Sequence, residues 1–113
     1  MDKETILLFT RNGIGQAPEE LSQMLVKKFL AVTLESGKLP AIMLFYTDGV
    51  KLACKGSAVL DELRAFEKGG VKLVLCQTCL NYFRLADQVE VGIVGGMGDI
   101  VEALAKASKV ITL

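Results

Sequence analysis

The sequence contains no histidine at all, and only two prolines and three cysteines among its 113 residues. Without an imidazole, serine and cysteine triads, histidine metal centres and histidine acid–base catalysis are all excluded. An odd number of cysteines, two of them too close together to join distant segments, argues against a secreted disulfide framework. Any catalysis must therefore depend on a thiol or a carboxylate, and the thiols are expected to be reduced.

Surplus charge and long apolar runs are also missing. Basic and acidic residues number 13 each and are scattered along the chain, so nucleic acid is not an expected partner. No run approaches the roughly 18 apolar residues of a membrane span. The opening residues Met1–Glu4 lack the basic character of a signal peptide. We therefore expect a cytoplasmic protein that does not enter a membrane.

What is present is an alternation of short apolar runs with helical segments, without a linker or a low-complexity stretch. Such alternation is typical of a parallel sheet covered by helices on both faces. We expect one α/β domain over residues 1–113. Its five strands are predicted at Thr5–Thr10, Ala41–Tyr46, Val71–Leu75, Val91–Val94 and Val110–Leu113.

Helices are expected between these strands. Proline followed by two glutamates suits a first helical turn, and Gly37 is expected to end that helix. Ser57 is expected to cap the second helix and Asp99 the fourth. The predicted ranges are Pro18–Ser36, Ser57–Lys68, Leu80–Ala86 and Asp99–Ala107.

The first predicted helix is apolar over more than half of its circumference, on two faces. These faces comprise Leu21, Met24, Leu25 and Phe29, and Val26, Leu30 and Leu34. We interpret the second face as a subunit contact or as a surface that another segment of the chain covers.

Three loops follow predicted strands at the carboxyl edge of the sheet, where ligands of open α/β folds gather. They are Arg11–Gly15, Cys76–Cys79 and Gly95–Asp99. Glycines permit close approach of the backbone to an anion such as a phosphate or a persulfide, although neither glycine-rich loop completes a dinucleotide motif or a P-loop. These glycines therefore either make tight turns or contribute to a ligand-binding rim, which would comprise Asn12, Gly13, Gly15, Gly95, Gly96 and Met97.

The strongest chemical signal is Cys76-Gln77-Thr78-Cys79. A cysteine at a helix N-terminus is expected to have a lowered pKa, because the helix dipole and free N–H groups stabilise the thiolate. A spacing of three places both sulfurs on one face of the first turn. Cys79 could then attack a group carried on Cys76 and form a disulfide. The alternative is that both are small buried side chains at a strand end.

The third cysteine, Cys54, lies far from this pair in the sequence, and the neighbouring Lys55 could favour its thiolate. Zinc needs four ligands, so no metal site is expected within one chain, whereas a site shared between subunits stays open. A dithiol oxidoreductase is a second interpretation of the motif. The chain, however, lacks a proline placed to face the pair as in thioredoxin-like folds, since its prolines are Pro18 and Pro40.

Further segments carry a resemblance over nearly the whole chain. They are Leu39-Pro40, Phe45–Leu52, Lys55–Leu60, Gly70-Val71, Cys76–Leu80 and Val91–Val94 leading to Met97. In these segments the sequence resembles the DsrE-like sulfurtransferases, and most closely the C-terminal domain of the YedF type, which is linked to selenium metabolism. It departs from that type in having Gly96 where Asn usually precedes Met97.

The resemblance implies a three-layer α/β/α domain that forms homo- or hetero-oligomers and needs no cofactor. By analogy with sulfur-relay relatives, Cys76 would carry a persulfide of sulfane sulfur or selenium, and Cys79 would act as resolving thiol. YedF-type proteins also carry an N-terminal TusA-like domain. The sulfur donor or acceptor is therefore expected to be a separate protein, such as a TusA-like one, or the chain is a piece of a longer protein. A non-catalytic oligomeric binding module remains a third interpretation.

Overall fold

The strands form from short apolar runs because the strands of a parallel sheet are buried on both faces. In the computed structural model, which describes residues 1–113, five parallel strands lie in the order β4-β3-β2-β1-β5. They are β1 (Thr5–Phe9), β2 (Ile42–Phe45), β3 (Lys72–Cys76), β4 (Ile93–Gly95) and β5 (Lys109–Thr112). All five predicted strands are confirmed, with ends that differ by no more than two residues.

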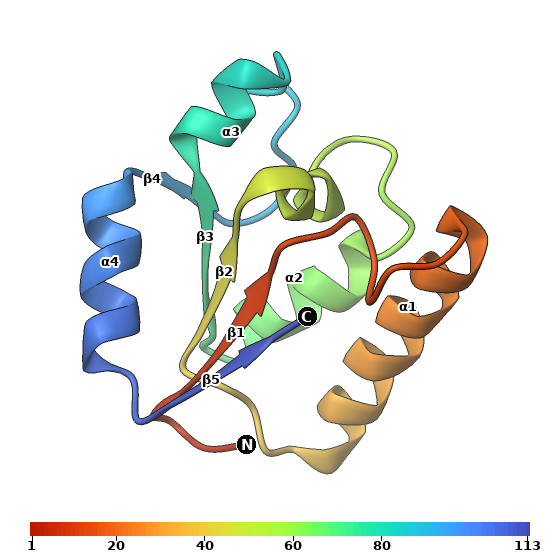
Figure 1. Ribbon diagram of the computed structural model, residues 1–113. Coiled ribbons are helices and arrows are strands. Elements are labelled where there is room, and N and C mark those ends of the chain that lie inside the picture. The colour runs from red at the N-terminus through yellow and green to blue at the C-terminus, as the bar shows by residue number, and fades with distance from the viewer.

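Helices cover both faces of this sheet, as expected for a three-layer α/β/α domain. The helices are α1 (Glu19–Ser36), α2 (Leu60–Lys68), α3 (Gln77–Tyr82), α4 (Met97–Lys106) and the 3-10 helix η1 (Thr47–Ala53). Figure 1 shows α1 and α2 on one face and α4 alone on the other, with α3 beyond the end of β3. Right-handed crossovers explain this arrangement, because the chain steps from β1 across to β4 and then returns to β5 over the opposite face. None of the helices is long and apolar enough to cross a membrane.

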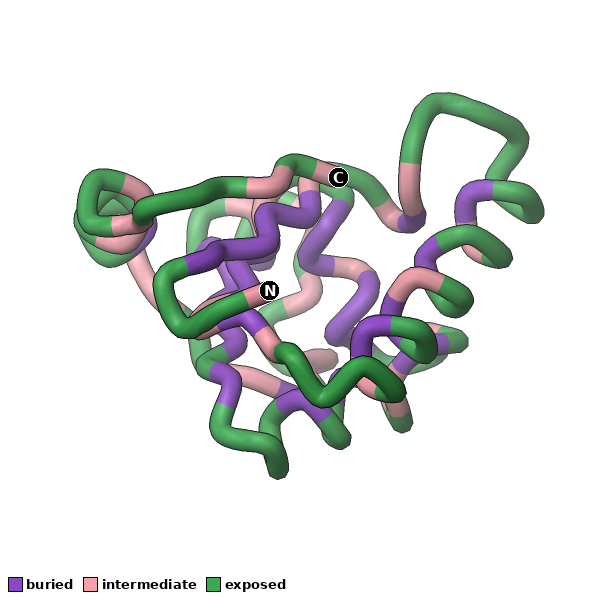
Figure 2. Tube along the Cα trace, turned by 90° about the horizontal axis from the view of Figure 1, so that it is seen from below, coloured by how far each residue is buried: buried purple, intermediate pink, exposed green.

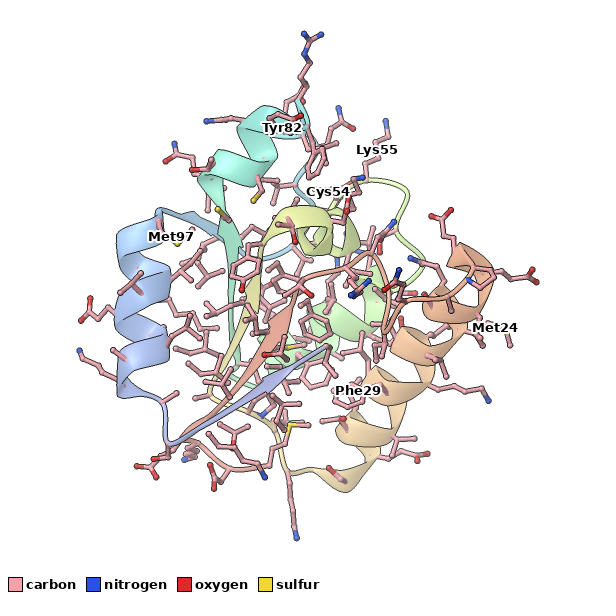
Figure 3. All side chains as sticks on the ribbon, viewed as in Figure 1. Met24, Phe29, Cys54, Lys55, Tyr82 and Met97 are labelled. Carbon is pink, nitrogen blue, oxygen red and sulfur yellow. The ribbon has the colours of Figure 1, made fainter.

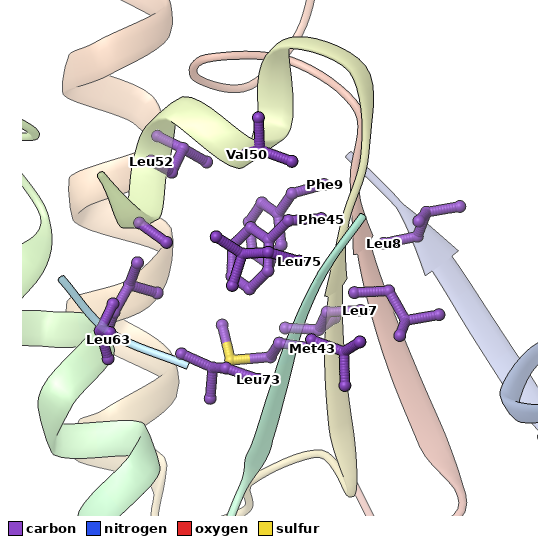
Figure 4. Packing of buried hydrophobic residues seen from close by; sticks show 14 of the residues in the cluster. Leu7, Leu8, Phe9, Met43, Phe45, Val50, Leu52, Leu63, Leu73 and Leu75 are labelled. Carbon is purple, nitrogen blue, oxygen red and sulfur yellow. The ribbon is translucent and has the colours of Figure 1, made fainter. Parts of the chain in front are cut away.

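A single cluster of 24 buried hydrophobic residues forms the core. The rings of Phe9 and Phe45, which are paired in register on β1 and β2, stack with centroids 5.1 Å apart. Figure 4 shows both rings beside Leu75, on the side of the sheet where Leu52 and Leu63 lie. Buried residues accordingly run along β1, β2 and β3, whereas the edge strands β4 and β5 are partly or fully exposed. Figure 2 shows buried and exposed residues alternating along the helices. Side chains on the strands thus hold the carboxyl edge of the sheet in place.

The predicted helix ends are correct in part. Gly37 ends α1 in a left-handed conformation (φ 69°) and donates its N–H to Leu34 O, as expected for a glycine stop. Pro18 stands just before α1 rather than in its first turn. The prediction that Ser57 caps the second helix is wrong. Its hydroxyl accepts the N–H of Val59 at 3.2 Å, and α2 begins after that turn, because the Ser57 side chain is used locally.

Of the two interpretations of the second apolar face of α1, the structure confirms that another part of the chain covers it, and the subunit contact is wrong. Val26 and Leu30 on this face are fully buried in the core, and α1 packs against α2. The exposed apolar side chains are instead Leu21, Met24 and Leu25. Figure 3 shows Met24 pointing away from the molecule and Phe29 pointing toward the core. Because both faces are apolar, the sequence alone could not show which one turns toward the core. The packing of α1 on the sheet decides this.

The 3-10 helix η1 follows β2 and was not predicted. Gly49 lies so close to the end of β1 that a Cβ built on it would be 2.0 Å from Phe9 O. The N–H of Tyr46 also donates to Phe9 O, at 3.1 Å. Only glycine permits this approach of backbone to backbone. The start of η1 is therefore fixed over the carboxyl ends of β1 and β2.

Candidate functional site

The cysteine pair lies where β3 passes directly into α3. Cys76 is the last residue of β3 and the N-cap of α3, and Cys79 lies in the first turn of that helix. The predicted range of the third helix, Leu80–Ala86, is therefore wrong by three residues at its start. The helix ends early because Arg84 adopts a positive φ of 59°. Both thiols thus belong to one strand-to-helix junction at the carboxyl edge.

The two thiols differ in exposure. Cys76 has no exposed surface, whereas Cys79 is half-buried. Leu73 and Leu75 lie on the side of the sheet where Leu63 of α2 packs, and strand alternation turns Cys76 to the opposite face, which α4 covers (Figure 4). Gly95 of β4 pairs with Cys76 in register. The two strands are closely packed at this point, because a Cβ on Gly95 would lie 2.7 Å from a Val74 methyl group. Solvent therefore reaches Cys79 but not Cys76.

A backbone N–H from the neighbouring strand end points at Cys79. The N–H of Thr47 donates to Cys79 Sγ, with nitrogen and sulfur 3.0 Å apart. Thr47 has a φ of 50°, an uncommon value for a β-branched residue. Its hydroxyl is placed to donate to Thr10 O, at 2.6 Å, or Tyr46 O, at 2.7 Å, which ties it to the ends of β1 and β2. The site thus includes a donor that the sequence analysis missed. The only available signal was that Thr47 follows β2 at the same edge.

The environment of Cys79 favours the neutral thiol. Burial is the main reason that the pKa of Cys79 is raised above its ordinary value. The N–H of Thr47 acts in the opposite direction, while the neighbouring Cys76 thiol and the charge of Asp48 raise the pKa further. The expectation that a position at a helix N-terminus would lower the pKa of the pair is thus wrong for Cys79. Desolvation is larger than the stabilisation from nearby N–H groups.

Cys54 is buried at the end of η1, away from the pair in sequence. Its thiol lies 3.2 Å from Val50 O, which can accept its S–H. Burial raises the pKa of Cys54, and the charge of Glu90 adds to that rise. The expectation that Lys55 favours the Cys54 thiolate is therefore wrong.

The glycine-rich loop Gly95–Asp99 is largely occupied by its own contacts. Asp99 accepts the N–H of Gly96 at 3.0 Å from within the first turn of α4. Asp99 thus caps the helix, although from inside it rather than from the predicted position before it. The Asp99 carboxylate therefore already accepts the Gly96 N–H, which a bound anion would need as a donor. Met97, at the start of α4, is half exposed.

The first glycine-rich loop folds toward α1 rather than toward the cysteines. Ile14 N–H donates to Ser22 O at 3.1 Å, and the Gln23 side chain donates to Asn12 O. Gly13 lies so close to Ser22 that a Cβ would be 2.7 Å from it. Because β2 separates β1 from β3, the predicted rim is divided into two parts. The part at Asn12, Gly13 and Gly15 shares contacts with α1, and the part at Gly95 lies beside Cys76.

The largest cavity on this edge does not contain the cysteine pair. It measures about 520 Å³, and its lining includes Asn12, Lys51, Cys54, Lys55 and Phe83. The Lys51 ammonium lies 4.4 Å from the centre of the Phe83 ring and is bound to Asp48 at 2.7 Å. Of the two lysines that line this cavity, Lys51 is thus already paired with a carboxylate. No group of three or more histidine, cysteine, aspartate or glutamate side chains is arranged to hold a metal ion.

Comparisons with known proteins bear on both fold and family. Two solved structures share the fold at a TM-score of 0.72 each. The ychN protein from E. coli is 18% identical, with 100% of both chains covered. The protein of unknown function MTH1491 from Methanobacterium thermoautotrophicum is 16% identical, with 99% of this chain and 100% of the other covered. No curated protein matches the sequence. A family model matches residues 28–113, which include the cysteine pair, and the chain therefore belongs to the DsrE/DsrF-like family.

Proposed function

We propose that the protein is a sulfur carrier of the sulfur-relay kind, which holds sulfane sulfur as a persulfide on the Cys76–Cys79 pair. Membership of the DsrE/DsrF-like family is consistent with such a role. The observation that carries the proposal is the thiol pair itself. One thiol is half-buried, the other is fully buried three residues earlier at the same strand-to-helix junction, and a backbone N–H is directed at the half-buried sulfur.

The chemistry needs no group other than these thiols. A thiolate attacks the outer sulfur of a donor persulfide, a new S–S bond forms, and the donor thiolate leaves with the electron pair of the broken bond. An acceptor thiolate then takes the same outer sulfur and restores the carrier thiol. No imidazole is available in the chain to act as a base. We therefore expect the solvent to take and return protons.

The resemblance to YedF-type proteins supplies the finer parts of the proposal. It assigns the persulfide to Cys76 and the resolving role to Cys79, and it extends the cargo to selenium. A separate TusA-like protein is the proposed donor or acceptor, and the chain is proposed to act as a homo-oligomer. A parallel assay with a selenium donor tests the cargo, and mixing with a TusA-like protein tests the transfer.

A second candidate is a non-catalytic binding module. The complete burial of Cys76 favours it, because free cysteine often fills space in a core. The raised pKa of Cys79 also favours it over a dithiol oxidoreductase, since such enzymes depend on a thiolate at neutral pH. Loss of partner binding in a variant that lacks both cysteines would argue against this second candidate.

The first test is sulfur loading measured by intact mass. The reduced protein is incubated with inorganic polysulfide, beside a Cys76→Ser/Cys79→Ser double variant and a Cys54→Ser control. We expect the wild type and the control to gain one sulfur, about 32 Da, or to release it as sulfide and keep a disulfide. The double variant should do neither. Equal loading of the double variant, or no loading of the wild type, would contradict the proposal.

A further inference from the structure

The proposed function needs sulfane sulfur on the Cys76–Cys79 pair, and the assignment of that sulfur to Cys76 comes from the family resemblance alone. The geometry of the pair favours a different order. Resting on that function, we propose that Cys79 is the thiol that accepts sulfane sulfur and that Cys76, beneath it, is the resolving thiol. This order is the reverse of the one that the family resemblance implies. It follows from access to the two thiols and from the hydrogen bond at Cys79.

Access separates the two thiols. An attacking sulfur must approach the donor's S–S bond in line, so the donor has to reach the nucleophile directly. Cys76 has no exposed surface and is held between β4 and the start of α3. Cys79 lies one turn further on, half-buried and on the side of α3 that meets η1. A persulfide on a donor protein can reach Cys79 without any movement of the sheet.

The backbone N–H of Thr47 opposes the effect of burial on a sulfur anion at Cys79. It donates to Cys79 Sγ at 3.0 Å, and a donor aimed at the reacting atom stabilises developing negative charge. The bonds of its hydroxyl and the close approach of Gly49 to Phe9 keep this donor in position. No such donor is directed at Cys76 Sγ. Thr47 is therefore a positioning residue in this scheme, and its left-handed backbone serves to aim the N–H.

Cys79 thiolate binds the outer sulfur of a donor persulfide, the donor S–S bond breaks, and the donor leaves as a thiolate that takes up the proton lost by Cys79. When no acceptor arrives, Cys76 thiolate attacks Cys79 Sγ and hydrosulfide leaves with the electron pair. The two cysteine thiols are then oxidised to a disulfide, and the sulfane sulfur is reduced to sulfide. A dithiol reductant returns the pair to its starting state.

Single variants distinguish the order of the thiols from the function itself. Reduced Cys76→Ser, Cys79→Ser and Cys54→Ser proteins are mixed with inorganic polysulfide, quenched over time and analysed by intact mass, with sulfide measured in parallel. We expect Cys76→Ser to gain about 32 Da at close to the wild-type rate and to keep it, without releasing sulfide. Cys79→Ser should load about tenfold more slowly or not at all. Cys54→Ser should match the wild type.

Each other outcome has a distinct meaning. Loading of Cys79→Ser at the wild-type rate, with none in Cys76→Ser, would overturn the proposed order and leave the sulfur-carrier function intact. Loading of both variants at the wild-type rate would also overturn the order, whereas no loading of the wild type would contradict the function itself. Circular dichroism confirms that each variant is folded. Cys76→Ala serves as a second variant at the buried position, because it places no hydroxyl in the core.

The role of Thr47 has a separate readout. Thr47→Gly keeps the N–H and the positive φ but removes the hydroxyl anchor, whereas Thr47→Ser keeps that anchor. The test uses a Cys76→Ser/Cys54→Ser background, in which Cys79 is the one remaining thiol. There, the pH profile of Cys79 alkylation should move to higher pH in Thr47→Gly. Without the hydroxyl anchor, the Thr47 N–H is held less firmly against Cys79 Sγ, and the pKa of Cys79 should rise. Thr47→Ser should restore the profile. A profile that is identical in all three proteins would overturn the positioning role.

Discussion

At the scale of single residues, the three thiols are chemically unequal although the sequence presents the same side chain three times. Cys54 and Cys76 are buried, and Cys79 is half-buried beside the N–H of Thr47 and the charge of Asp48. Burial is the largest cause of the raised pKa of Cys79, so little thiolate is present at neutral pH. Reactivity at this site is therefore controlled by both access and pH.

Alkylation should report both effects. We expect iodoacetamide to modify Cys79 before Cys76 and Cys54, with a rate that continues to rise above the pH at which an ordinary thiol levels off. Asp48→Asn should raise the rate a few-fold near neutral pH, because the removed carboxylate disfavours the thiolate and the freed Lys51 favours it. Peptide mapping by mass spectrometry gives the order and the rates. Asp87→Asn is the matched control, and faster modification of Cys76 than of Cys79 would contradict the expectation.

At the scale of elements, η1 positions the site as much as α3 does. It begins at Thr47, whose N–H meets Cys79, and it contacts α3 directly. Gly49 allows η1 to lie directly against the end of β1, because no side chain fits between Gly49 and Phe9 O. A short 3-10 helix without its own core thus depends on one glycine for its place.

Substitution of this glycine should be costly. Gly49→Ala would place a Cβ 2.0 Å from Phe9 O, and we expect a loss of about 1–3 kcal/mol in the free energy of unfolding, together with slower sulfur loading. Gly98→Ala is the matched control. Nothing lies within 4 Å of a Cβ there, and alanine in a helix should leave stability unchanged or raise it by up to about 1 kcal/mol. Urea unfolding of both variants measures the difference. Equal stability of the two would contradict this account of Gly49.

At the scale of the whole molecule, two groups of exposed apolar side chains remain uncovered. One lies on α1 and includes Leu21, Met24 and Leu25. The other spans the edge strand β4 and helix α4, and comprises Ile93, Val94, Met97 and Val101. An apolar edge strand without a charged residue is an open position for pairing. Met24 and Met97 lie on opposite sides of the molecule in Figure 3, so one partner cannot cover both groups by a single small contact.

We expect the chain to be a homo-oligomer that uses the group on β4 and α4. A Met97→Glu/Val101→Glu variant should lower the mass measured by light scattering after size exclusion, because charge is costly in an apolar interface. Met24→Glu tests the group on α1 in the same way. A monomeric wild type would contradict the expectation, and a lower mass only for Met24→Glu would move the interface to α1.

The sequence by itself determined the five strands, the α/β architecture and the place of the cysteine motif at a strand end. Apolar runs and glycine stops are local signals, and buried parallel strands and Gly37 depend on little else. It did not determine which face of α1 turns inward, because both faces are apolar. It also could not give the true start of α3, because nothing in the motif marks where the helix begins.

Only the tertiary structure decided how the site is assembled. The strand order places β2 between β1 and β3, which brings Thr47 to Cys79 and leaves the Asn12–Gly15 loop on α1. The pairing of β4 with β3 buries Cys76 beside Gly95. Burial and hydrogen bonding depend on segments far apart in the chain, and these two effects set the exposure and the pKa of a thiol. The motif alone therefore identified the pair but not the different environments of its two thiols.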